Sequence, residues 1–113
     1  MLPRLWGNDV TSPSKGGSLK ENGCGKFSGV DDRSLGYIRS KGFTHVWYTG
    51  IIRHAVTEAF GSCQASPGSI VKGAAGSPYA ITAYYDVNPY LADNPAERIS
   101  EFKDLLKRTH DHN

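Results

Sequence analysis

Residues Phe43 to Ile52 read FTHVWYTGII, an almost unbroken run of β-branched and aromatic side chains. Such side chains are enriched in strands, and a run without polar alternation is typical of a strand covered on both faces. Strands of this kind occur mostly in parallel sheets, whose faces are covered by helices. The run therefore predicts a buried strand in an α/β fold.

A short helix is predicted directly before this strand. Asp31 or Asp32 can provide its N-cap, and Leu35 and Ile38 lie three residues apart on one face. Gly42 provides a left-handed exit from the helix. The connection from Gly42 into the strand is then short, as connections from helices to strands usually are.

A second and clearer helix is predicted near the end of the chain. Asn94 is a suitable N-cap, Pro95 occupies the first helical position, and Glu97 completes a capping-box arrangement. One apolar stripe follows, so the helix is amphipathic and must cover another part of the fold. The stripe consists of Ile99, Phe102, Leu105 and Leu106.

Irregular segments connect these elements. Residues 1–6, MLPRLW, are apolar enough to end a strand, although Pro3 confines them to a strand end. The chain then stays rich in Gly, Ser, Lys and Asn to about Gly29, which predicts a loop. Residues 55–76 are small and glycine-rich, and their length predicts a functional loop rather than a simple connector.

The predicted order of elements is incomplete for an independent α/β domain. A helix after a buried strand normally leads into the next parallel strand, and that strand is missing here. Two parallel strands and two helices would leave the sheet edges unpaired. We therefore expect the 113 residues to form one piece of a larger α/β fold.

The composition argues against several classes of partner. Thirteen basic and eleven acidic residues give a net charge of only +2, and no basic run marks a nucleic-acid-binding face. No stretch approaches the roughly 20 apolar residues of a membrane helix, and the start lacks the features of a signal peptide. The sequence therefore does not indicate the cellular compartment of the protein.

The sequence predicts no metal site. Cys24 and Cys63 lack a CxxC spacing, so they indicate two isolated thiols, with a pairing between them left open. His110 and His112 form an H-x-H pair for which no third ligand is evident.

Three motifs, in their order and spacing, resemble the α-amylase superfamily of glycoside hydrolases. LPRLWGN is similar to the end of the first barrel strand, and LGYIRSKGFTHVWYTGI to the following helix and second strand. SPYAITAYYDVNPYLADNPAERISEFKDLLKRTH is similar to the segment after them. The resemblance implies a partial (β/α)8 TIM barrel, to which residues 1–113 contribute strands one and two with their helices. It also implies retaining hydrolysis of α-glucosidic bonds in starch-like glucans or oligosaccharides.

The same resemblance places the catalytic acids outside the chain, on later barrel strands. A retaining glycosidase needs two carboxyl groups about 5–5.5 Å apart. The eleven carboxylates present suggest no such pair. We therefore expect no catalytic residue here, and no hydrolase activity from the isolated chain.

Tyr79 is the residue that the resemblance marks most strongly as a sugar contact. The corresponding tyrosine stacks on the sugar at the point of cleavage, and an aromatic face suits the C–H face of a pyranose; the alternative is a tyrosine that packs a loop against the barrel rim. Arg53 and His54 follow the second strand and would contact sugar hydroxyls or form an exposed rim pair. Ser77 stands where many members have His, and Ala83 replaces an Asp, so each change removes a polar partner. Ser77 itself is the fourth residue expected to contact the substrate.

Other expectations follow from the resemblance. Tyr84, Tyr85 and Tyr90 are expected to be structural. No cofactor is expected in this segment, although calcium is possible in the intact enzyme. The expected partners are an α-glucan or oligosaccharide and the remainder of the barrel or a second copy. Two alternatives remain: a non-catalytic carbohydrate-binding or degenerate module, and a structural fragment that completes its sheet by oligomerising.

Overall fold

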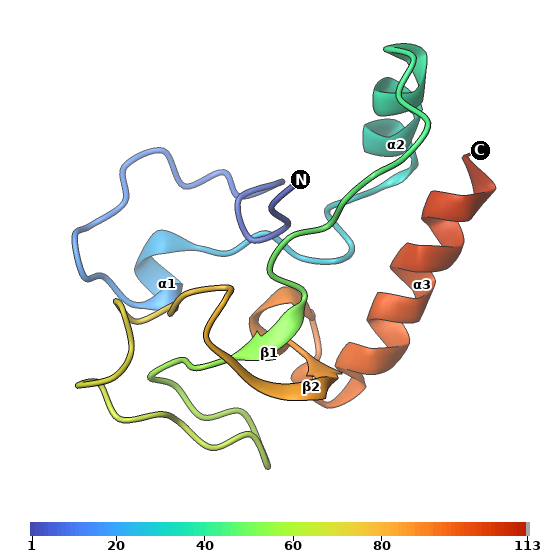
Figure 1. The fold of residues 1–113 in the computed structure, drawn as a ribbon. Helices are drawn as coiled ribbons and strands as arrows, with labels where there is room; N and C mark the ends of the chain where they lie inside the picture. The colour runs from blue at the N-terminus through green and yellow to red at the C-terminus, as the bar shows by residue number, and fades with distance from the viewer. Residues whose placement is uncertain (113) are drawn as a thin grey trace.

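The structure, a computed structural model, describes residues 1–112. Figure 1 shows a small sheet in the lower half of the molecule, with two helices on one side of it and long irregular segments on the other side and below it. The regular elements are α1 (Leu19–Asn22), α2 (Asp32–Ser40), β1 (Ile52–His54), β2 (Ile81–Val87), the 3-10 turns η1 (Pro89–Leu91) and η2 (Pro95–Glu97), and α3 (Arg98–Asp111).

The prediction of a partial (β/α)8 barrel is wrong. The two strands β1 and β2 pair antiparallel, with Ile52 opposite Val87 and His54 opposite Ile81, and they form a two-stranded sheet. No parallel strand pair with a crossover helix occurs within residues 1–112. Strand pairing joins residues far apart in sequence, so the apolar run alone could not reveal which partner each strand would take.

Residues 43–51, which predicted the buried strand, are extended but almost unpaired. The amino group of Met1 donates to the Trp47 carbonyl at 2.7 Å, and the Thr49 N–H donates to the Met1 carbonyl at 2.8 Å. These bonds follow a parallel pattern. The pairing ends there, because the chain turns at Pro3 and the Trp6 N–H bonds back to the Leu2 carbonyl.

Because no strand or helix of residues 1–112 covers them, large side chains of this run lie in solvent. Trp47 is 82% exposed, and Phe43 is also exposed. Only Ile52 of the run belongs to a strand, β1, and the longer strand is β2, where the sequence predicted no strand. Its Ile, Thr, Tyr and Val content is typical of strands, so composition was an available signal.

The helix before the extended run is confirmed. The Asp31 carboxylate caps α2 by accepting the Ser34 N–H at 2.8 Å, and Gly42 leaves the helix with φ of 84°. The sequence missed α1, a four-residue helix whose Ser18 and Glu21 form a capping box.

The last helix is confirmed with a different cap. The Asn94 side chain accepts the Ala96 N–H at 3.1 Å and starts η2, which leads into α3. The carboxylate that reaches back is Glu101 rather than Glu97, since it accepts the N–H groups of Asp93 and Asn94 at 2.8 and 2.7 Å. The capping box predicted at Glu97 is therefore wrong.

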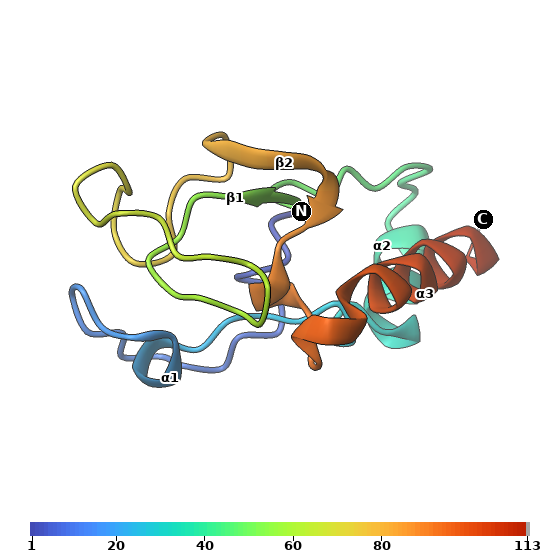
Figure 2. The ribbon, with the colours of Figure 1, turned by 90° about the horizontal axis from the view of Figure 1, so that it is seen from below.

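The core lies where α3 meets α2 and the segment that leads into α2, and both views show these two helices together (Figures 1 and 2). Leu105 of the predicted apolar stripe is fully buried, whereas Ile99 is partly exposed. Arg108 fixes α3 by donating to the carbonyls of Phe27 and Val30 at 2.8 and 3.3 Å. The buried cluster consists of Phe27, Val30, Leu35, Ile51, Val87, Leu91, Ala92 and Leu105.

Two further expectations concern thiols and membranes. Cys24 and Cys63 are free, so the interpretation as isolated thiols is confirmed. Within residues 1–112, no helix has the length and apolar character needed to cross a bilayer.

Candidate functional site

The strongest candidate site is a turn that presents one aromatic ring, and we call residues 77–80 the Tyr79 turn. The Ala80 N–H donates to the Ser77 carbonyl at 3.0 Å, which closes a β-turn. The Ser77 hydroxyl accepts the Tyr79 N–H at 3.3 Å. Pro78 occupies the second position, where its fixed φ stabilises the turn. Tyr79 is 82% exposed on this locally ordered turn.

The Tyr79 turn rests on the chain beneath it. A Cβ at Gly50 would lie 3.2 Å from Pro78 Cβ and 3.3 Å from Leu2 Cδ1, so a side chain there would push these groups away by a few tenths of an ångström. Gly50 also has φ of 79°, a conformation that glycine adopts without strain. On the other side of the turn, the Ala55 N–H donates to the Ala80 carbonyl at 2.9 Å. The turn is thus joined to the end of β1.

His54 lies under this site rather than on its surface. Its side chain is buried, with the residue only 3% exposed. Nε2 lies 3.0 Å from the Ala75 carbonyl oxygen, and Nδ1 lies 3.3 Å from the Ile52 carbonyl oxygen. The imidazole therefore contacts the main chain that precedes the Tyr79 turn, where a sugar hydroxyl does not reach it.

Arg53 points away from His54, because successive strand residues face opposite sides of a sheet. Its Nη1 lies 3.4 Å from Oδ2 of Asp86. Arg98 holds the same carboxylate with two N–H groups, from Nε at 2.7 Å and from Nη2 at 3.1 Å. The hydrogen bonds from Arg98 hold the pKa of Asp86 below its usual value. The cluster joins β1 and β2 to the start of α3.

The structure therefore divides the four residues predicted for substrate binding. Ser77 and Tyr79 share one turn, His54 supports the segment before it, and Arg53 belongs to the ion-pair cluster on the other side of β1. Arg4 carries no predicted role, although its Nη1 donates to the Gly76 carbonyl at 3.2 Å. No local pattern could have indicated a contact between residues 72 positions apart.

A second surface carries the other tyrosines. Tyr84 is 74% exposed and Tyr85 is fully exposed, so the expectation that they pack into the fold is wrong. They line an open apolar groove of about 510 Å³ between β2 and α3. We call it the β2–α3 groove, and its other lining residues are Tyr48, Ile51, Ile52, Asp86, Val87, Ile99 and Phe102.

Tyr90 is structural, as expected. It is buried, and its ring lies edge-on to Phe60 with the ring centres 4.7 Å apart. Burial, with the nearby Glu58 carboxylate, raises the pKa of Tyr90 to about 12.

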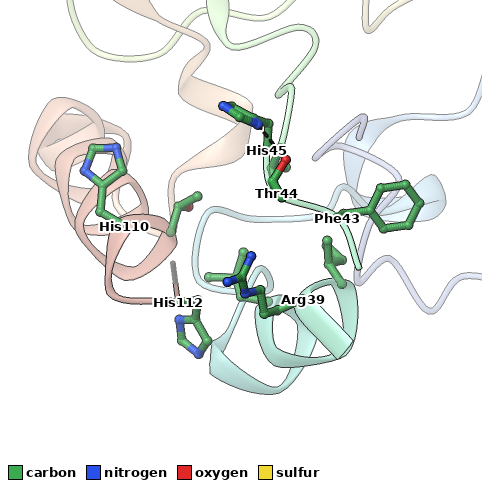
Figure 3. Close-up of a pocket in the computed structure, with 10 residues that line it drawn as sticks. Arg39, Phe43, Thr44, His45, His110 and His112 are labelled. Carbon is green, nitrogen blue, oxygen red and sulfur yellow. Dashed lines mark hydrogen bonds between the residues drawn. The ribbon is translucent and has the colours of Figure 1, made fainter. Parts of the chain in front are cut away.

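A small cavity of about 160 Å³ lies between α2, residues 43–46 and the end of α3 (Figure 3). Figure 3 shows the rings of His110 and His112 pointing in different directions, while the guanidinium of Arg39 lies between the two helices. His112 Nδ1 lies 2.9 Å from the Arg108 carbonyl oxygen. Within residues 1–112, no three His, Cys, Asp or Glu side chains are grouped as metal ligands would be. The possibility that a longer enzyme containing this segment binds calcium stays a prediction.

Comparisons of the chain with protein families, with curated proteins and with solved structures found no match. The membership in the α-amylase superfamily therefore stays a prediction that depends on the three motifs.

Proposed function

We propose that the chain binds an α-glucan through the Tyr79 turn, as a saccharide-contacting part of an α-amylase-type glycoside hydrolase. One observation carries the proposal: the Tyr79 ring is 82% exposed although the turn that bears it is hydrogen-bonded and packed from below. An exposed ring on a hydrogen-bonded turn can stack on the C–H face of a glucosyl unit, and binding then costs little conformational entropy of the protein.

The polar groups around the ring suit this role. The carbonyls of Ala75 and Gly76 already accept donors from His54 and Arg4, so neither needs a sugar hydroxyl to satisfy it. The exposed Tyr79 hydroxyl can instead exchange its water for a sugar hydroxyl, as tyrosine does at many binding surfaces. Stacking on the Tyr79 ring is therefore the main contribution to the free energy of glucan binding. We expect the chain by itself to bind glucan with modest affinity.

The chain is expected to bind glucan without cleaving it. Asp86 is a carboxylate at the end of β2 whose two oxygens accept hydrogen bonds from Arg98. These bonds lower its pKa, so Asp86 stays ionised, and both of its oxygens are already engaged. A general acid must be protonated near the working pH, and a nucleophile must reach the anomeric carbon. Purified chain incubated with starch should release no reducing ends above a heat-denatured sample. Reproducible release that a Tyr79→Ala variant lowers would contradict this expectation.

Substitution of Tyr79 tests the binding proposal. Calorimetric titration with maltohexaose should give a Kd that rises about tenfold in Tyr79→Ala, since a stacked aromatic contributes about 1–1.5 kcal/mol. Tyr79→Phe keeps the ring and should stay close to the wild-type value. Tyr37→Ala is the matched control, because Tyr37 is also an exposed tyrosine but lies on α2. An equal loss in Tyr37→Ala, or wild-type binding of cellohexaose with the same affinity, would contradict the proposal.

A second candidate function is self-association, which the β2–α3 groove favours. Its exposed Tyr84 and Tyr85 belong to a sheet of only two strands, in which each strand has a free edge. A second copy would cover these rings and pair the edge of the sheet. Sedimentation velocity across a concentration series should then show a dimer that Tyr85→Ser disrupts, and a monomer at every concentration would exclude this candidate.

A further inference from the structure

Three consecutive carbonyl groups before the Tyr79 turn are fixed by donors from elsewhere in the chain. Ala74 accepts the Thr57 N–H at 3.2 Å. Ala75 accepts from His54 Nε2 at 3.0 Å, and Gly76 accepts from Arg4 Nη1 at 3.2 Å. Arg4 Nη1 also lies 3.5 Å from the Ala75 carbonyl oxygen.

From these contacts we propose that Arg4 and His54 are positioning residues that hold the Tyr79 turn in the conformation that presents its ring. We call the pair the Arg4–His54 clamp. Its importance for glucan affinity rests on the binding function proposed above, whereas its effect on the turn does not.

The clamp acts where regular structure is lacking. Residues 55–80 contain no helix and no strand, so no continuous backbone ladder orders the segment that enters the turn. Backbone N–H groups hold the carbonyls of Ala74 and Ala80 at its two ends, and side-chain donors hold those of Ala75 and Gly76 between them. Both side-chain donors come from parts of the fold that are themselves fixed. His54 is a residue of β1. Arg4 lies in the N-terminal turn, where the Arg4 carbonyl accepts the Gly25 N–H at 2.8 Å.

The two donors differ in their surroundings. The His54 ring is buried, and both of its ring nitrogens face carbonyl oxygens, with the shorter contact at Nε2, whose N–H can donate to Ala75. Arg4 is half-buried, and its guanidinium cannot lose its proton in a protein. A carbonyl that loses its donor in such a site stays poorly satisfied, so the segment is expected to rearrange when either donor is removed.

Loss of the clamp should weaken glucan binding through disorder. Tyr79 follows Gly76 by three residues, and Pro78 and the bond between Ala80 and Ser77 transmit the position of Gly76 to the ring. When the entry to the turn fluctuates, glucan binding must order it again, and that cost lowers affinity. We expect a Kd about tenfold higher without either donor, similar to the loss of one well-placed contact.

The test removes each donor and compares it with a substitution that keeps one. Arg4→Met and His54→Leu remove the N–H groups, whereas Arg4→Lys and His54→Gln each keep a donor of similar reach. Arg39→Met is the matched control, because Arg39 is an exposed arginine of α2. Amide hydrogen exchange of Gly76 and Ala80 is followed by NMR beside that of Leu35 and Leu105 in the core, and maltohexaose affinity is measured for the same proteins.

In the donor-free variants, the Gly76 and Ala80 amides should exchange about tenfold faster or more, with unchanged Leu35 and Leu105 amides. The Lys and Gln variants should recover at least part of the protection and of the affinity. Exchange at Gly76 and Ala80 that stays as in Arg39→Met would overturn the clamp, and so would a uniform increase that includes the core. If wild-type protein binds no maltohexaose, the proposed function fails, and the exchange rates alone decide about the clamp.

Discussion

Gly76→Ala is expected to lower the free energy of unfolding by about 3 kcal/mol. The residue has φ of 65°, which costs alanine about 1–2 kcal/mol. A Cβ at this position would also collide with the Ala55 carbonyl oxygen and lie 3.3 Å from His54 Cδ2. The chain must then shift where β1 meets the segment before the Tyr79 turn, and such overpacking costs about 1–3 kcal/mol.

Gly73→Ala separates the two causes of this loss. Gly73 has φ of 71°, and a Cβ there would meet no atom within 4 Å, so only the backbone cost remains. Urea unfolding should place Gly73→Ala about 1–2 kcal/mol below wild type and Gly76→Ala clearly lower. Equal losses in the two variants would show that Gly76 does not make the close approach described above.

Asp86→Asn is expected to cost about 2–3 kcal/mol at neutral pH. The carboxylate is only 14% exposed and pairs with two arginines, so an amide would leave both guanidinium groups without their counter-charge. Removal of one partner of a buried ion pair costs about 3–5 kcal/mol, and partial exposure lowers that figure. Asp104→Asn, which changes an exposed aspartate of α3, should have little effect.

The cost of Asp86→Asn should depend on pH. Hydrogen bonds from Arg98 lower the pKa of Asp86 in the folded chain below the ordinary value of about 3.9. A depressed carboxyl pKa contributes stability that is fully present above that ordinary value and is lost as pH falls through the folded pKa. The difference between wild type and Asp86→Asn should therefore be constant from neutral pH to about pH 5 and shrink below about pH 4. A difference that stays constant into acid would contradict the role of the Asp86 charge.

The sequence predicted helices better than strands, and the physical reason is locality. The caps of α2 and of η2, which leads into α3, lie within a few residues of the elements they start, so Asp31 and Asn94 could be recognised. Glu101 rather than Glu97 accepts the N–H groups of Asp93 and Asn94, so the predicted pattern was right in kind and wrong in the residue. The pairing of β1 with β2 joins residues about 30 positions apart, and no local pattern specifies it.

In the candidate site, too, the local features could be predicted from the sequence and the long-range contacts could not. Ser77 and Tyr79 belong to one short motif, and the structure keeps them in one turn. The burial of His54 depends on which face of β1 it occupies and on the loop that folds over it. Its position directly after the predicted strand therefore indicated an exposed residue, whereas the structure buries it. Arg4 had no recognisable role, because its contact with Gly76 spans most of the chain.

A titration of the ¹⁵N-labelled chain with maltohexaose, followed by NMR, tests glucan binding at the Tyr79 turn most directly. We expect shifts that concentrate on the amides of Ser77, Tyr79 and Ala80, while the amide signal of Tyr37 stays in place. Shifts confined to Tyr84 and Tyr85 in the β2–α3 groove, or no shift at saturating oligosaccharide, would contradict binding at this turn.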